Sequence, residues 1–277
     1  MNSHRHSHRH IDIMGIVNLT DDSYFAESRC GDVAAVLGRV EQMVEEGVDI
    51  VDLGACSTRP GAEFVGADEE WRRLEPALKV IRERYPDLRL SIDTCFSSVV
   101  ERAYNQIGEF IVNDITAGEM DPEMLPVVGR LGLRYVAMHM RGNPQTMQSL
   151  TDYNDVTQEV KKYFEDFSLK AHKNGIKDWI LDPGFGFAKT IAQNYKLLSE
   201  LSQLKSVRRA DGTLASILVG ISRKSMIYKL LDITPDESLS ATQALHMVAL
   251  QNGIDILRVH DVAAEKQVVK LYKSLFM

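Results

Sequence analysis

The chain has 277 residues, of which 44% are hydrophobic and 26% are charged, and its formal net charge is −7. This composition is typical of a folded globular protein and excludes a largely disordered chain. Its acidity argues against a protein that coats nucleic acid, and no run of about 20 apolar residues is available to span a membrane. Because the N-terminus also lacks an apolar secretory segment, we expect a cytoplasmic protein with neither nucleic acid nor membrane as a partner.

The first ten residues differ in character from the rest of the chain. Histidine alternates with polar residues there, so residues 1–10 are predicted to be a tag-like or disordered His-rich extension. We expect residues 11–277 to form one domain. The three cysteines, Cys30, Cys56 and Cys95, include no C-x-x-C pair, which predicts free thiols in a reducing compartment.

Predicted strands and helices alternate along the chain. Apolar and β-branched runs predict eight strands, at residues 11–19, 48–53, 88–92, 110–112, 133–138, 179–181, 217–219 and 254–259. Stretches with helical spacing of apolar residues lie between them, at residues 32–46, 69–84, 96–107, 155–174, 194–204 and 238–252. Glycines at positions 47, 108, 132, 175 and 253 are placed to end helices before the next strand.

This alternation predicts an α/β fold with parallel strands and right-handed crossovers. About eight repeats favour a closed (β/α)8 TIM barrel. The alternative, an open doubly wound sheet, would carry a G-x-G-x-x-G turn after its first strand, and the sequence has none there.

Nearly every predicted strand ends in a polar or charged residue. In chain order these ends are Asn18, Ser57-Thr58-Arg59, Asp93, Asn113, His139, Asp182, Lys224 and Arg258-Val259-His260. Burying such groups costs free energy unless they find partners, and active sites of TIM barrels lie at the carboxyl ends of the strands. An aspartate alone is often a helix cap, and a lysine or arginine alone is usually a solvated charge. The joint pattern favours one shared site at the barrel mouth.

The residue types at these ends describe a ligand with two parts. Asp93, Asn113 and Asp182 supply hydrogen-bond acceptors, which predicts a ring rich in N–H donors at the deep end. The cations Arg59, Lys224, Arg258 and His260 predict an anionic group such as a phosphate further out.

Eight short motifs then reveal a resemblance that extends from Ile13 to about Val262. They are M-G-I-V-N-L-T from Met14, S-T-R-P-G from Ser57, S-I-D-T from Ser91, V-N-D-I from Val112, M-H-M-R-G-N-P-Q-T-M from Met138, D-P-G-F-G-F-A-K from Asp182, G-I-S-R-K-S from Gly220 and R-V-H-D from Arg258. In this order, the motifs resemble those of the dihydropteroate synthases of folate biosynthesis.

The resemblance implies a transferase that condenses 6-hydroxymethyl-7,8-dihydropterin pyrophosphate with p-aminobenzoate. It implies that the pterin is bound by Asp93, Asn113, Asp182 and Lys224, and the pyrophosphate by Asn18, Arg59, Arg258 and His260. It also implies that p-aminobenzoate lies among Thr58, Pro60, Phe187 and Ser225, with Lys224 nearby. Arg59, Lys224, Arg258 and His260 are then the expected catalytic residues, with Mg²⁺ near Asn18 as the cofactor, a homodimer as the assembly, and sulfonamides as inhibitors.

Some residues keep an ordinary alternative. Phe187 could be a core residue, but its position between glycines in a loop favours the site. His139 is equally compatible with packing and with ligand contact, and Cys56 is interpreted as structural.

The first loop departs from the family pattern. The family usually has N-x-T-P-D-S-F-x-D-G-G, whereas this chain lacks the proline and both glycines, and Ala26 replaces the usual aspartate. Our hypothesis is that Glu27 supplies the missing carboxylate, with Asp21 as the other candidate.

Two alternative functions stay open from sequence. A corrinoid-dependent methyltetrahydrofolate methyltransferase would share the pterin-binding acidic residues but has no need of a pyrophosphate site. A catalytically silent pterin-binding protein is conceivable because of the altered first loop, although it has no need of leaving-group residues.

Overall fold

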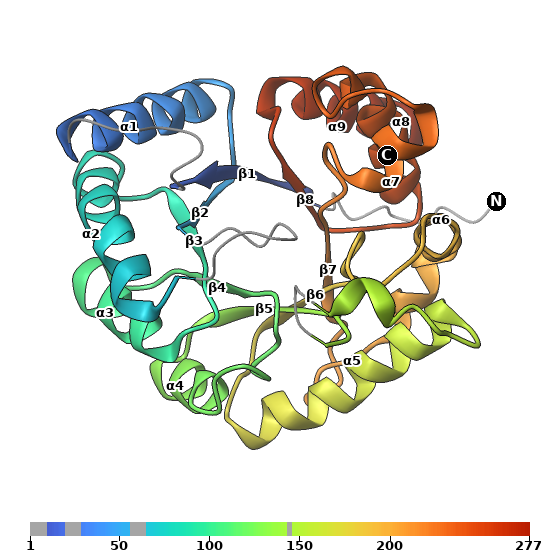
Figure 1. Ribbon diagram of the computed structural model, residues 1–277, viewed down its shortest axis with the longest axis horizontal. Helices are drawn as coiled ribbons and strands as arrows, with labels where there is room; N and C mark the ends of the chain where they lie inside the picture. Colours follow the sequence, from blue (N-terminus) through green and yellow to red (C-terminus); the bar gives the residue numbers. More distant parts are fainter. Residues whose placement is uncertain (1–9, 20–28, 56–64, 143–145) are drawn as a thin grey trace.

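In the computed structural model, which describes residues 10–19, 29–55, 65–142 and 146–277, the strands form a closed barrel (Figure 1). They are β1 (Asp12–Asn18), β2 (Ile50–Gly54), β3 (Arg89–Asp93), β4 (Ile111–Asp114), β5 (Arg134–Met138), β6 (Trp179–Asp182), β7 (Ser216–Val219) and β8 (Ile256–Val259). Every pairing is parallel, and β8 pairs with β1. The predicted (β/α)8 TIM barrel is confirmed, and the open-sheet alternative is wrong.

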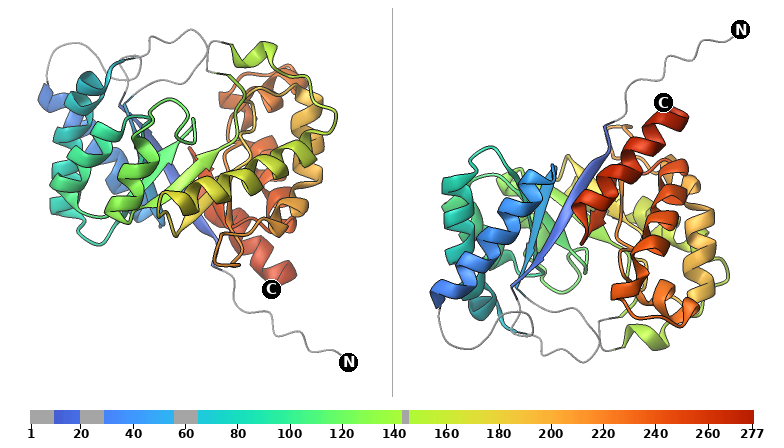
Figure 2. Two further views of the ribbon diagram at one scale, coloured as in Figure 1. Left: turned by 90° about the horizontal axis from the view of Figure 1, so that it is seen from below. Right: turned by 90° about the horizontal axis from the view of Figure 1, so that it is seen from above.

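Helices surround the barrel, as Figure 2 shows from two sides. They are α1 (Arg29–Glu45), α2 (Ala67–Arg84), α3 (Ser97–Ile107), α4 (Met124–Leu131), α5 (Val156–Lys173), α6 (Ile191–Ser199), α7 (Ser225–Leu231), α8 (Leu239–Gln251) and α9 (Val262–Phe276). Short 3-10 helices cover Met147–Ser149, Leu201–Ser206 and Asp236–Ser238. The predicted segment 194–204 is thus divided between α6 and a 3-10 helix, and none of the helical segments predicted above covers α4, α7 or α9.

Local sequence signals explain where these helices begin and end. Asp155 caps α5, because its carboxylate accepts hydrogen bonds from the backbone N–H groups of Thr157 and Gln158. Thr190 and Gln193 form a reciprocal capping box at the start of α6. At the other end of a helix, Gly132 takes up a left-handed conformation after α4, with φ of 68°. The glycine predicted to end this helix is therefore confirmed in that role.

An apolar layer fills the barrel interior on the amino-terminal side of the polar strand ends. It is built by one residue from each of seven strands, namely Met14, Ile50, Ile111, Val136, Ile180, Leu218 and Ile256, all buried. Because side chains alternate along a strand, the next inward position lies two residues further on. In β2, β4, β6 and β8 that next position carries Asp52, Asn113, Asp182 and Arg258. The apolar layer is therefore the base on which a polar layer stands.

Some predictions lie outside the described residues. These include the His-rich extension up to residue 9, Cys56, and the side chain of Cys30, whereas Cys95 is described and is buried. Among the helices that are described, none combines the length and the apolar character needed to cross a membrane.

Candidate active site

The described polar ends of β3, β4, β6 and β8 meet at one end of the barrel, as predicted. Asp93 closes β3, Asn113 lies in β4 and Asp182 closes β6, and both Asn113 and Asp182 are buried. Arg258, from β8, reaches across to Asp93, with 2.9 Å between its terminal nitrogen and Asp93 Oδ2. Residues separated by up to 165 positions in the chain are thus brought into contact.

Asp52 joins this group, although the sequence analysis did not identify it as a site residue. It is fully buried in β2, and its Oδ2 atom accepts hydrogen bonds from Asn113 Nδ2 at 3.1 Å and Arg258 Nε at 2.7 Å. Its Oδ1 atom has no hydrogen-bond partner among the described residues. The sequence feature that could have identified Asp52 is a charged residue inside an otherwise apolar strand, two positions after Ile50.

The position of Arg258 differs from the one expected. The sequence predicts this cation further out, beside an anion, whereas in the structure its guanidinium lies between the carboxylates of Asp52 and Asp93. Arg258 is thus paired with acidic residues, whereas the sequence predicts that it binds an anion. The arginine therefore binds part of the acceptor layer.

Burial changes the proton affinity of the acidic residues. It raises the pKa of Asp93 to about 7, an effect that Arg258 opposes and that the neighbouring Asp52 carboxylate strengthens. Burial likewise raises the pKa of Asp182, against the attraction of Lys224. A ligand that donates N–H groups to these carboxylates would offset the cost of burying them.

Lys224 lies beside this acidic layer. Its Nζ donates a hydrogen bond to the Phe185 carbonyl at 2.7 Å and lies 4.7 Å from the centre of the Phe187 ring. Burial lowers the pKa of Lys224 to about 8, while the Asp182 carboxylate acts in the opposite direction. The half-buried Phe187 packs against a mouth cluster of Met138, Met140, Met147 and Ala188 rather than against the main core. Phe187 is therefore only partly buried, against this smaller cluster, and its role in the site stays a prediction.

The outer residues are described only in part. Asn18 is exposed at the end of β1, and His260 follows β8 with its Nδ1 atom 3.0 Å from Ser222 Oγ. Ser225 is half-buried at the first position of α7. Thr58, Arg59 and Pro60 lie outside the described residues, as do Asp21, Ala26 and Glu27 of the first loop.

His139 and Lys189 form a buried pair behind the mouth. Lys189 Nζ lies 3.0 Å from His139 Nδ1, and only 4% of Lys189 and 3% of His139 is exposed. The packing interpretation of His139 therefore has direct support. Lys189 was quoted within the D-P-G-F-G-F-A-K motif but was given no role.

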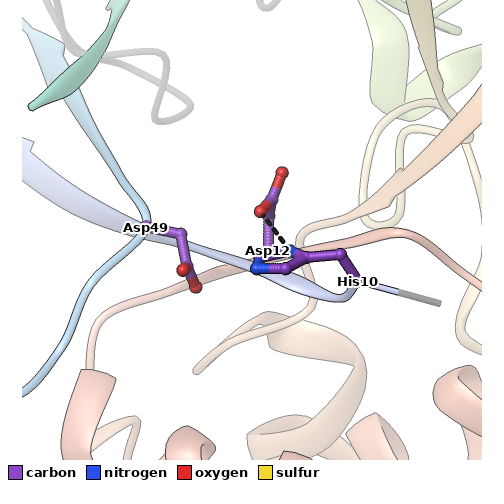
Figure 3. A group of neighbouring side chains, drawn as sticks. All are labelled: His10, Asp12 and Asp49. Atoms are coloured by element: carbon purple, nitrogen blue, oxygen red, sulfur yellow. Dashed lines mark ion pairs between the residues drawn. The ribbon is translucent and has the colours of Figure 1, made fainter. Parts of the chain in front are cut away.

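A group of potential metal ligands in the described chain lies at the opposite end of the barrel. His10, Asp12 and Asp49 stand near the beginnings of β1 and β2, and Figure 3 shows their side chains together. Both carboxylates already have cationic partners: Arg89 binds Asp12 through two nitrogens, at 3.0 and 2.7 Å, and Lys266 lies 2.9 Å from Asp49. This group does not fit the Mg²⁺ expected near Asn18.

Comparison with known proteins agrees with this geometry. Residues 14–260 match the family model described as pterin binding enzyme. A dihydropteroate synthase of Synechocystis sp. is 40% identical over 267 residues, covering 95% of this chain and 90% of the relative.

Solved structures give the same result. The Yersinia pestis dihydropteroate synthase, in complex with a sulfonamide drug, superposes with a TM-score of 0.87 at 32% identity, covering 96% of this chain and 94% of that chain. The Burkholderia cenocepacia enzyme, in complex with 7,8-dihydropteroate, superposes with a TM-score of 0.85 at 34% identity, covering 97% of this chain and 92% of that chain. The chain therefore belongs to the pterin-binding enzymes. Within that family its relatives place it among the dihydropteroate synthases, which are transferases.

Proposed function

We propose that this enzyme condenses 6-hydroxymethyl-7,8-dihydropterin pyrophosphate with p-aminobenzoate to give 7,8-dihydropteroate and pyrophosphate. The observation that carries the proposal is the set of acceptors formed by the buried Asn113 and Asp182 and the half-buried Asp93 above an apolar barrel base, with Lys224 beside it. An amino-pyrimidine edge donates several N–H groups and also accepts, so it matches carboxylates and an amide together with one lysine.

The pterin is proposed to take over contacts that the protein now makes with itself. Arg258 occupies Asp93 Oδ2, and Lys224 donates to the Phe185 carbonyl. Binding of the ring requires Asp93 to be released from Arg258, and Lys224 to turn toward the ring. The freed arginine is then available to the pyrophosphate.

The pyrophosphate is proposed to bind Asn18, Arg59, Arg258 and His260. A single exposed amide oxygen fits Mg²⁺, because this ion commonly keeps several waters and uses few protein ligands besides substrate phosphates. When bound beside Asn18, Mg²⁺ would neutralise part of the charge of the leaving group. Arg258 supplies a cation with a planar fork of donors for the same purpose.

The p-aminobenzoate is proposed to lie among Thr58, Pro60, Phe187 and Ser225. Its amine forms a bond to the methylene carbon of the pterin while the bond from that carbon to the pyrophosphate oxygen breaks. The leaving group departs with the bonding electrons, and the nitrogen releases one proton to solvent. Since the aromatic amine attacks without a charge, catalysis depends on positioning and on stabilising the departing anion.

A pyrophosphate-release assay tests this proposal. Purified enzyme is supplied with the pterin pyrophosphate, with and without p-aminobenzoate and with and without Mg²⁺. Pyrophosphate release that needs both p-aminobenzoate and Mg²⁺ supports the synthase, whereas pterin binding without release would support the silent binding protein.

We further propose one barrel domain over residues 11–277, a homodimer and a cytoplasmic location, in line with the family resemblance.

A further inference from the structure

The loop between β6 and α6 has an unusual backbone. Gly184, Gly186 and Ala188 all have positive φ, with values of 69°, 83° and 49°. The value is disfavoured for Ala188, which has a Cβ atom, so the surrounding contacts must maintain it. This loop carries Phe187 and begins directly after Asp182 and Pro183.

The carbonyl groups of this loop are bound by two lysines, the buried Lys189 and the half-buried Lys224. Lys224 binds the Phe185 carbonyl at 2.7 Å, whereas Lys189 binds the carbonyls of Gly184 and Phe187, each at 3.0 Å. The two lysines differ in whether they can keep these hydrogen bonds when the pterin binds. Lys224 faces the proposed pterin site, so it must leave its carbonyl when the ring binds, while Lys189 has no such competing partner in the proposed function.

His139 completes the surroundings of Lys189. Its Nδ1 atom is the third polar neighbour of Lys189 Nζ at 3.0 Å, and its ring is held edge-on by Tyr163, with 4.9 Å between ring centres. The loop also passes close to the His139 backbone: a Cβ atom added to Gly184 would lie 2.0 Å from the His139 carbonyl oxygen. The pair therefore joins the end of β5 to the loop after β6.

The pair can keep its hydrogen bonds in either protonation state. Burial lowers the pKa of Lys189 to about 7, with Asp182 acting against this effect and Lys224 and Arg141 strengthening it. A charged Lys189 donates to both carbonyls and to His139 Nδ1. A neutral Lys189 still donates to both carbonyls and can accept a hydrogen from the other tautomer of His139.

We propose that Lys189, supported by His139, is a positioning residue that holds Phe187 in place for p-aminobenzoate while Lys224 is engaged with the pterin. This inference rests on the proposed function. It assigns to Lys189 no contact with either substrate.

The test compares Lys189→Met with Lys196→Met, a matched exposed lysine on α6 that is paired with Glu200. Lys189→Met is expected to raise the KM for p-aminobenzoate and the inhibition constant of a competing sulfonamide by the same factor, at least about tenfold. Binding of 6-hydroxymethylpterin, measured by calorimetry without p-aminobenzoate, is expected to change less than about threefold. Lys196→Met should leave all three quantities as in the wild type.

A second pair of variants keeps the test usable if Lys189→Met does not fold. His139→Gln retains an acceptor for Lys189 and should preserve the KM for p-aminobenzoate, whereas His139→Leu should raise it. Equal losses in pterin and p-aminobenzoate binding, or no change in any variant, would overturn the inference. Absence of p-aminobenzoate-dependent pyrophosphate release in the wild type would instead refute the proposed function.

Discussion

Replacing Asp52 by asparagine tests whether the buried acidic layer controls the position of Arg258. The variant keeps nearly the same shape but removes the charge that accepts from Arg258 Nε at 2.7 Å. A hydrogen bond between charged groups contributes about 1.5–3 kcal/mol, which corresponds to a change of about 10- to 150-fold. We expect kcat/KM for the pterin pyrophosphate to fall by a factor in this range, because Arg258 would then depend on Asp93 alone.

Asp52→Asn should also change the pH dependence of kcat/KM for the pterin pyrophosphate. Asp93 must be ionised to accept from the pterin, and burial raises its pKa to about 7, so affinity for the pterin should increase as pH rises through about 7. The Asp52 carboxylate contributes to raising that pKa. Removing its charge should therefore move the acidic limb of the kcat/KM profile to lower pH.

Steady-state kinetics between pH 5.5 and 9 would measure both effects, with Asp114→Asn as the control. Asp114 is equally buried but accepts hydrogen bonds from Tyr135, Thr116 and Gly118 instead of from site residues. Asp114→Asn should lower the thermal midpoint while leaving the plateau value of kcat/KM nearly unchanged. Because the Asp114 carboxylate also raises the pKa of Asp93, but less than Asp52 does, the acidic limb of the profile should move less than in Asp52→Asn. The reasoning about Asp52 fails if Asp52→Asn leaves both the magnitude and the pH profile of kcat/KM at wild-type values.

Three further predictions concern packing, inhibition and the first loop. Gly129→Ala would place a Cβ atom 1.7 Å from the Asn174 carbonyl oxygen, and it should lower the free energy of unfolding, measured in urea, by about 1–3 kcal/mol. Gly38→Ala is the control: its Cβ atom would face open space in α1, so it should raise the same free energy by about 0.5–1 kcal/mol. Sulfonamides should compete with p-aminobenzoate, and inhibition that excess p-aminobenzoate does not relieve would contradict this. Glu27→Gln should lower turnover by about tenfold if Glu27 supplies the carboxylate that Ala26 lacks, and an unchanged turnover would refute that role.

The barrel could be predicted from sequence because its signals are local and repeated. Each strand is a short apolar run, and most helices have their own apolar spacing, although α4, α7 and α9 lie outside the predicted helical segments. The meeting of Asp93, Asn113 and Asp182 followed from those signals, since the carboxyl ends of parallel strands in a barrel share one mouth. No knowledge of side-chain conformation was needed for that step.

The pairing within the site could not be predicted in the same way. Arg258 has a long side chain, and whether it points to an anion outside or to Asp52 and Asp93 inside depends on charges 206 and 165 positions away. Lys189 likewise depends on His139, 50 positions earlier. The partner of each charged side chain depends on the desolvation cost of burying it and on the attraction of the charges around it in the assembled barrel. No local sequence pattern indicates that balance.

The shared use of Arg258 leads to a prediction about the substrate itself. In the proposed exchange, a pterin without pyrophosphate separates Asp93 from Arg258 and leaves the arginine with Asp52 alone, whereas pyrophosphate offers a replacement for Asp93. Pyrophosphate should therefore raise the affinity for 6-hydroxymethylpterin, and the pterin should raise the affinity for pyrophosphate by the same factor, because the coupling between two ligands is reciprocal. We expect a factor of about 5 to 150, measured by calorimetry with each ligand alone and in the presence of the other. Independent binding of the two ligands would show that Arg258 does not exchange partners, and that the arrangement of Asp52, Arg258 and Asp93 persists when the site is occupied.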